Sequence, residues 1–167
     1  MEEIKNKVKD SGLISLDLAK FKPIEIVEGI DIAAQLWQGL VLKEKDFRAW
    51  IKEHNWSEYQ NKVVFIHCSA DALVPTWAYM LVVSALLPFV KKVEVGTEET
   101  ILKSLIVDNI YQEPIEQYID GKVIIKGCSD ISAPEFAMSK LIERLQPVVK
   151  SIMYGEPCST VPIYKRK

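Results

Sequence analysis

Apolar residues along this chain occur in two patterns, continuous runs and helical spacing, which predict strands and helices. Continuous β-branched runs at Val63–Ile66 and Val123–Ile125 are typical of strands that are covered on both faces. Each run is followed by an apolar stretch of helical spacing that opens at a proline, at Thr76–Leu87 and at Glu135–Leu145. The pattern therefore predicts two strand–helix units. The stretch Thr76–Leu87 is apolar almost all round, which predicts a deeply placed helix.

Weaker patterns add further elements. Phe47, Trp50 and Ile51 recur at helical spacing in a stretch that starts at Lys43 and closes at His54. This stretch is expected to form a helix, and a further helix is expected between Thr97 and Glu116. Short strands are expected at four further places: Leu13–Leu16, Ile24–Val27, Val93–Gly96 and Ile152–Gly155.

The two strand–helix–strand units resemble each other in sequence. Residues 59–96 and 118–155 both contain a lysine, a β-branched run that ends on Cys-Ser, and an Asp and a Pro beyond it. Alignment of Cys68 with Cys128 needs one deletion between Ser129 and Asp130. We interpret this similarity as an internal duplication.

The order of these elements predicts an α/β fold. Strand–helix–strand crossovers are right-handed and make parallel strand pairs, so two of them supply four parallel strands. We expect a layered, mainly parallel sheet with helices packed on it, built around the two duplicated units. Residues 1–167 are interpreted as a single domain.

Composition narrows the class of protein. The chain has 167 residues, 49% hydrophobic, with 21 basic and 23 acidic side chains and a net charge of -2. Such a balance provides no positive excess for nucleic acid. No apolar stretch is long enough for a membrane span, and residues 1–5 do not resemble a signal peptide. A cytoplasmic protein is therefore expected, while the composition leaves the oligomeric state open.

The three cysteines are the main candidates for chemistry, because each one precedes a serine and follows a predicted parallel strand. Ligands bind at the carboxyl edge of such sheets. Cys68, Cys128 and Cys158 could hold zinc or an iron–sulfur cluster there. The candidates for a fourth ligand are His67, Asp71, Asp130 and Glu156. Since neighbouring strands are about 4.8 Å apart, we expect at least two of the sulfurs, Cys128 and Cys158, within about 8 Å of each other.

Two other interpretations stay open. Cys68 could be the reactive cysteine of a thiol-dependent enzyme or sulfur carrier, with His67 beside it. The phosphate-binding loop of tyrosine phosphatases and rhodaneses is excluded, because Val74 stands where those loops need an arginine. Alternatively, the protein is an interaction module whose cysteines only pack in the core.

Four segments of the chain resemble a bacterial domain-of-unknown-function family. They are Gln38–Phe47, Cys68–Ala72 with Pro75–Met80, Lys126–Ser129, and Gly155–Pro162, which reads GEPCSTVP. The resemblance covers nearly the whole chain and implies a small cytoplasmic protein without an assigned activity. It also implies iron–sulfur assembly proteins as partners.

Overall fold

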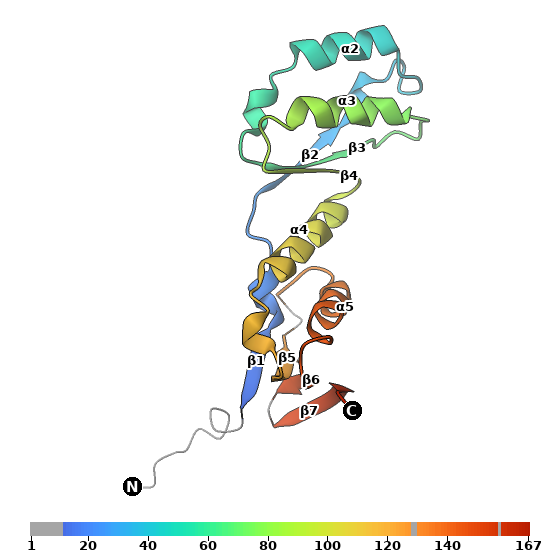
Figure 1. The fold of residues 1–167 in the computed structure, drawn as a ribbon. Helices are drawn as coiled ribbons and strands as arrows, with labels where there is room; N and C mark the ends of the chain where they lie inside the picture. The colour runs from blue at the N-terminus through green and yellow to red at the C-terminus, as the bar shows by residue number, and fades with distance from the viewer. Residues whose placement is uncertain (1–11, 128–129, 157) are drawn as a thin grey trace. The chain divides into compact units, whose positions relative to one another are not determined.

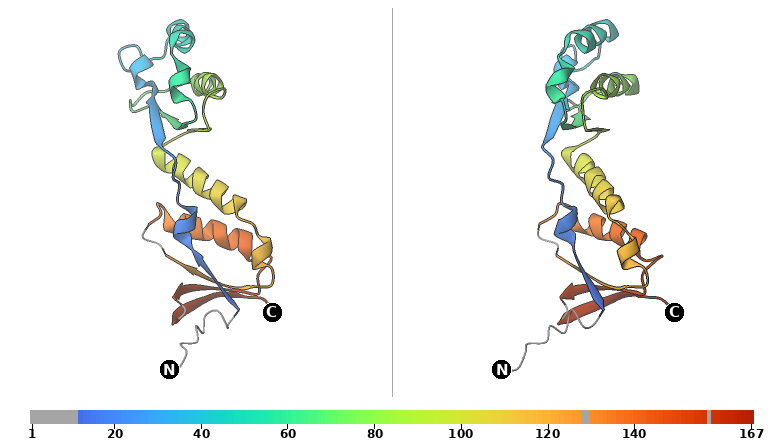
Figure 2. Two further views of the ribbon diagram at one scale, coloured as in Figure 1. Left: turned by 90° about the vertical axis from the view of Figure 1, so that its left-hand side faces the viewer. Right: turned by 60° about the vertical axis from the view of Figure 1, so that its left-hand side comes forward.

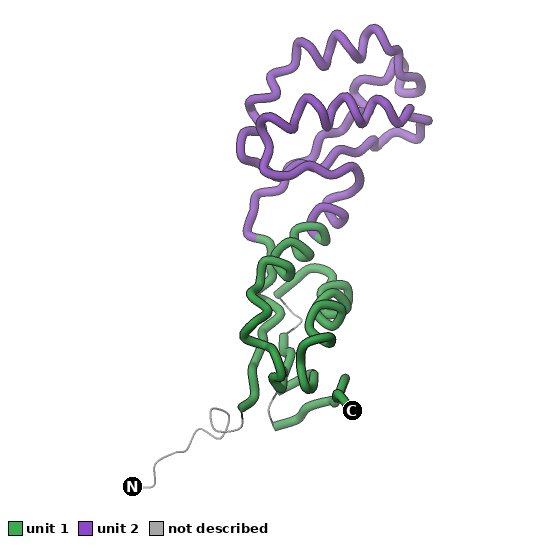
Figure 3. Tube along the Cα trace, in the orientation of Figure 1, with its two compact units in different colours: residues 1–23, 103–167 green, residues 24–102 purple. Residues whose placement is uncertain are grey.

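The computed structural model describes residues 12–127, 130–156 and 158–167, and these form two compact units. Residues 24–102 make unit 2, and residues 1–23 and 103–167 make unit 1 (Figure 3). Unit 2 is therefore inserted into the chain of unit 1. The expectation of a single domain stays a prediction.

Unit 2 is a three-stranded parallel sheet with two helices. Strand β3 (Val63–His67) lies between β2 (Val27–Asp31) and β4 (Lys92–Val95). Helices α2 (Glu44–Glu53) and α3 (Thr76–Leu86) lie on one side of this sheet (Figure 1). Their apolar faces meet the sheet in one core, which is formed by Ile30, Ile32, Phe47, Trp56, Tyr59, Val64, Ile66, Ala78, Val82 and Leu86.

Unit 1 has a four-stranded sheet. Strand β5 (Lys122–Lys126) pairs in parallel with β1 (Leu13–Asp17) and with β6 (Ser151–Glu156). Strand β7 (Ser159–Lys165) returns antiparallel beside β6 and completes the order β1-β5-β6-β7. Helix α5 (Pro134–Leu145) lies along this sheet in both turned views (Figure 2).

The core of unit 1 is separate from that of unit 2. Helix α4 (Glu98–Gln112) contributes Ile106 and Ile110 to it, and α5 contributes Ala137, Leu141 and Leu145. The described residues also form four 3₁₀ helices: η1 (Leu18–Phe21), η2 (Ile32–Gln35), η3 (Trp56–Tyr59) and η4 (Glu116–Tyr118). None of the described helices is both long and apolar enough to cross a membrane.

The same local structure occurs in both units, with residue numbers that differ by 59. The Asn61 amide donates to the Phe89 carbonyl at 2.8 Å, and the Asp120 amide donates to the Val148 carbonyl at 2.9 Å. Positive φ angles of 61° and 55° occur at the same two donors. Ala78, Val82 and Leu86 are buried in α3, as are Ala137, Leu141 and Leu145 in α5. These matches support an internal duplication, which stays an interpretation.

The predicted α/β class is confirmed, and the six helix and strand assignments in the two strand–helix–strand units agree with the structure. One common sheet was the wrong expectation, because β3 and β4 lie in one sheet and β5 and β6 in another. The strand expected at Ile24–Val27 instead begins at Val27, and Ile24 and Ile26 are exposed. Helix α3 is not deeply placed, because Met80 is 66% exposed.

Candidate functional site

The carboxyl edge of the unit 2 sheet gathers polar side chains around Asp31. Asp31 ends β2 and lies opposite His67, the last residue of β3. The Ser69 amide donates to Asp31 Oδ1 at 3.0 Å, and the Ser69 hydroxyl donates to Oδ2. The Ala33 amide also donates to Oδ1, at 2.9 Å. One carboxylate therefore caps η2 and fixes the loop that follows β3.

These contacts keep Asp31 ionised. The Ser69 hydroxyl is the main cause that lowers the pKa of Asp31, and the Ala33 amide and the His67 ring lower this pKa further. Donated hydrogen bonds stabilise the charged form of a carboxyl group. The edge of the sheet therefore carries a fixed negative charge at neutral pH.

Cys68 lies between His67 and this anchored serine. Its side chain is half-buried against the core of unit 2, and its thiol donates to the Ala70 carbonyl at 3.7 Å. Tyr79 of α3 interacts electrostatically with Cys68 and with Asp31. Burial is the main cause that raises the pKa of Tyr79, and electrostatic interaction with the side chains of Cys68 and Asp31 raises this pKa further. The Tyr79 phenol is therefore protonated, and a protonated phenol can donate a hydrogen bond.

His67 and Cys68 are directed to opposite faces of the sheet. Cys68 packs on the same core as Val64 and Ile66. The His67 ring instead stacks with the Phe65 ring, with centroids 5.4 Å apart. Successive strand residues alternate in this way. The structure does not bring the His67 ring to the Cys68 sulfur.

The carboxyl edge of the unit 1 sheet has an equivalent aspartate, but it has no thiol in the place of Cys68. Asp17 Oδ1 accepts the Ala19 amide at 2.9 Å, as Asp31 accepts the Ala33 amide. The residue that corresponds to Cys68 is Gly127, with a φ of 81°. A Cβ atom at Gly127 would lie 2.7 Å from Asp17 Oδ1. The alignment of Cys68 with Cys128 is therefore shifted by one residue.

Four of the other predicted site residues lie in the described part of the chain, and all four are exposed. Cys158 is exposed in the turn between β6 and β7 of unit 1, while Cys128 and Ser129 lie outside the described residues. Asp71, Asp130 and Glu156 are exposed. In residues 12–127, 130–156 and 158–167, no group of three His, Cys, Asp or Glu side chains is placed to hold a metal ion. The predicted separation between Cys128 and Cys158 stays a prediction.

Sequence reasoning missed Asp31 and Tyr79. A signal for the carboxylate was present, since Leu16-Asp17-Leu18-Ala19 and Ile30-Asp31-Ile32-Ala33 both place an Asp between apolar residues at a strand end. That repeated pattern predicts two equivalent capping carboxylates. Tyr79 gave no such signal, because an aromatic residue in an apolar helix is usually part of the core.

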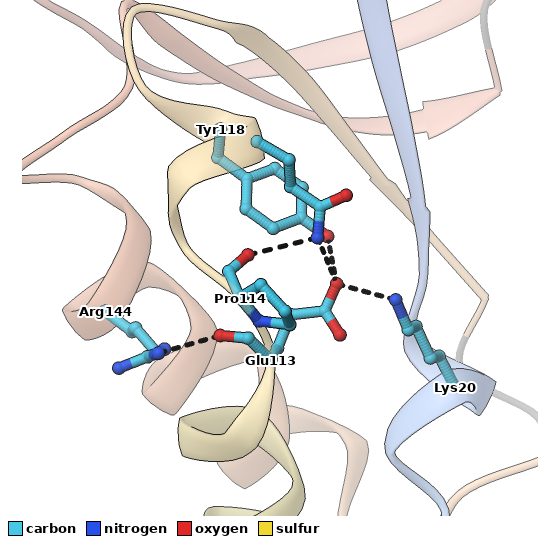
Figure 4. A network of polar contacts seen from close by, with 6 residues as sticks. Lys20, Glu113, Pro114, Tyr118 and Arg144 are labelled. Carbon is cyan, nitrogen blue, oxygen red and sulfur yellow. Dashed lines mark hydrogen bonds and ion pairs between the residues drawn. The ribbon is translucent and has the colours of Figure 1, made fainter.

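A second polar cluster surrounds Glu113 in unit 1 (Figure 4). Glu113 Oε1 lies 2.6 Å from Lys20 Nζ and accepts hydrogen bonds from Tyr118 and Gln117, each at 2.7 Å. The Glu113 carbonyl accepts Arg144 Nη2 at 2.8 Å. The partners of this carboxylate come from within the unit itself, so the cluster joins η1, α4, η4 and α5 and serves the fold.

Comparison with known proteins defines a family without an assigned activity. One family model matches residues 2–166, and it describes its members as proteins of unknown function. No curated protein and no solved structure matches the chain significantly.

Proposed function

The chain belongs to the DUF2480 family, and on the geometry at the edge of unit 2 we propose that it is a thiol-dependent sulfur carrier that uses Cys68. The observation that carries this proposal is the position of Cys68. It follows β3 directly and precedes Ser69, which Asp31 holds in place. Ligands bind preferentially at this edge of a parallel sheet.

Asp31 and Tyr79 have distinct roles in this proposal. Asp31 fixes the loop on which the thiol lies, and therefore acts as a positioning residue. Tyr79 is close enough to Cys68 for the two groups to interact electrostatically, and its protonated phenol is the proposed hydrogen-bond donor to the thiolate. His67 has no role at the sulfur. A reducing compartment such as the cytoplasm keeps the thiol available.

The proposed step is sulfur transfer by thiolate attack. The Cys68 thiolate attacks the outer sulfur of a donor persulfide, the donor sulfur–sulfur bond breaks, and the donor leaves as a thiolate. Cys68 then carries the persulfide, with no net oxidation. Attack of an acceptor thiolate on the outer sulfur returns Cys68 to the thiolate form.

Mass spectrometry after treatment with inorganic polysulfide tests this function. We expect the Cys68 peptide to gain the mass of one sulfur atom, and an added thiol to remove it. Cys68→Ser should abolish this labile sulfur, and Cys158→Ser serves as the matched control because Cys158 is exposed in a turn of the other unit. Equal labelling of all the cysteines, or none at Cys68, overturns the proposal.

The strand order of unit 1 favours a second candidate function, which is metal or iron–sulfur binding by Cys128 and Cys158. These residues follow β5 and β6 in the sequence, and the two strands are parallel neighbours. Two thiols that follow neighbouring strands suit zinc or an iron–sulfur cluster when other ligands complete the set. Iron–sulfur assembly proteins are the partners of this candidate.

Metal analysis of protein purified without oxygen separates the two candidates. Stoichiometric zinc or iron that is lost in Cys128→Ser and Cys158→Ser, but retained in Cys68→Ser, supports the metal site. An iron–sulfur cluster would also absorb visible light. Metal-free protein with three titratable thiols contradicts this second candidate and leaves the sulfur carrier untouched.

A further inference from the structure

An open apolar groove lies between α3 and β4 in unit 2. It has a volume of about 420 Å³ and is lined by Thr76, Tyr79, Met80, Val83, Ser84, Leu87 and Val95. Three of these side chains are strongly exposed, namely Met80 at 66%, Leu87 at 62% and Val95 at 45%. Exposed apolar side chains that gather in one place mark an interaction surface.

The corresponding groove of unit 1 is smaller and is bordered by a strand. It lies between α5 and β6, has a volume of about 200 Å³, and is lined by Ile125, Met138, Ile142, Met153, Tyr154 and Ile163. Ile163 belongs to β7, which pairs antiparallel with β6. Within the described residues, β4 instead ends the order β2-β3-β4. An antiparallel strand is therefore the structural solution that this protein itself uses at such an edge.

We propose that a second copy of this chain closes the groove, with β4 antiparallel to β4 of that copy about a two-fold axis at Val93. In this register Lys92 lies opposite Glu94 of the second copy, and Glu94 lies opposite Lys92. Both cross-strand pairs have opposite charges. Within one strand Lys92 Nζ lies 3.9 Å from Glu94 Oε1, so the pairing brings together four charges of alternating sign, which favours it. Charge complementarity of β4 with itself therefore selects a second copy as the occupant.

Helix α3 can also pack against α3 of the second copy in this arrangement. Thr76, Met80 and Ser84 of α3, and Leu87 directly after it, recur at intervals of three and four residues and border the groove. A two-fold axis through the strand pair brings the α3 helices of both copies onto one face of a continuous six-stranded sheet. Met80 and Leu87 are then covered, and the small Thr76 and Ser84 allow close approach. The interface is isologous, as in most dimers.

Charge reversal tests the proposal on the full chain. Light scattering after gel filtration should find a dimer for the natural sequence. Lys92→Glu places like charges opposite each other at both pairs, as does Glu94→Lys, and each should weaken dimerisation about ten-fold. Lys92→Glu combined with Glu94→Lys should restore the dimer. A mixture of the two single variants should form heterodimers, since all of the opposite charges are then complementary.

Two further variants keep the test decisive. Met80→Lys with Leu87→Lys places cations on exposed positions of α3 and should give a folded monomer. Lys140→Glu, at an exposed pair on α5 of unit 1, is the control that should leave the dimer unchanged. A monomeric natural protein at high concentration, or single charge variants that dimerise as well as the natural sequence, overturns the proposal. A monomer that binds an extended peptide at β4 would assign the groove to another protein. None of these outcomes depends on the chemistry of Cys68.

Discussion

Individual side chains in this protein form small polar clusters, and the Glu113 carboxylate of unit 1 has three side-chain partners. Burial alone would raise the pKa of Glu113, but its bonds to Lys20, Tyr118 and Gln117 outweigh burial and lower this pKa. A carboxyl group with a lowered pKa in the folded state adds stability above its unfolded pKa of about 4.3. This stability is lost as the pH falls through the lower pKa of the folded protein.

We predict that Glu113→Gln destabilises the protein by about 1–2 kcal/mol at pH 7, because the charged hydrogen bonds to Lys20 and Tyr118 are weakened. Urea unfolding measures this change in the free energy of unfolding. The difference from the natural protein should shrink as the pH falls below the unfolded pKa of about 4.3 and through the lower pKa of Glu113 in the folded protein. Glu143→Gln, at a surface pair with Lys140, should change the stability by less than about 0.5 kcal/mol. Equal effects at both sites would contradict the role of the cluster.

Tyr79 provides a second prediction at the scale of a single residue. Tyr79→Phe removes the proposed hydrogen-bond donor to the Cys68 thiolate while it keeps the aromatic ring. We expect iodoacetamide to alkylate Cys68 more slowly near neutral pH, by a factor of about three to ten. Tyr111→Phe, at an exposed tyrosine of unit 1, should leave the rate unchanged. An unchanged rate in Tyr79→Phe would remove Tyr79 from the proposed site.

At the scale of elements, the pairing of β2 with β3 depends on a close contact between a glycine and an aromatic ring. Gly29 lies opposite Phe65 in this parallel pair. A Cβ atom at Gly29 would lie 2.6 Å from Phe65 Cζ. The ring therefore occupies the space that a side chain at position 29 would need.

We expect Gly29→Ala to cost about 1–3 kcal/mol, because the Phe65 ring must move. The same change in a Phe65→Leu background should cost less, since the shorter side chain leaves room for the methyl group. A double-mutant cycle by chemical unfolding measures this coupling between the two positions. Additive effects would show that the ring does not set the requirement for glycine.

The elements were easier to predict than their partners. The apolar runs at Val63–Ile66 and Val123–Ile125 have a strand pattern, and the stretches after Pro75 and Pro134 have a helical one. Hydrophobic periodicity is local, and it carries no information about which strand pairs with which. One sheet was therefore expected where the structure has two. Strand β7 was missed, because Pro162 interrupts its pattern, which edge strands tolerate.

The candidate site was only partly predictable, for a related reason. Cys68 lies at the carboxyl end of a parallel strand as expected. The resemblance of two Cys-Ser steps favoured the alignment of Cys68 with Cys128. The strand registers instead make Val63 equivalent to Lys122, and therefore Cys68 equivalent to Gly127. Gly127 explains why no side chain occupies the position equivalent to Cys68. Its φ is positive, and a Cβ atom at this position would be too close to Asp17. The sequence alone does not reveal that exclusion.

At the scale of the whole molecule, the two units are unequal in how they use the chain. Every buried residue of the unit 2 core lies between Ile30 and Leu86. The unit 1 core instead combines Leu16, Leu18 and Phe21 with residues from Ile106 onward. Unit 2 is therefore continuous in sequence, while unit 1 is assembled from two segments that the insertion separates.

This difference predicts that residues 24–102 fold alone, whereas residues 103–167 do not. The first fragment keeps its three strands and its complete core, so we expect cooperative thermal unfolding by circular dichroism. The second fragment lacks β1, which pairs with one side of β5, and it lacks the three buried core residues of β1 and η1. Its folding should be rescued when residues 12–23 are joined to it through a flexible linker. An unfolded 24–102 fragment would show that its own core does not suffice for folding, and a 103–167 fragment that folds alone would show that β1 and η1 are not required.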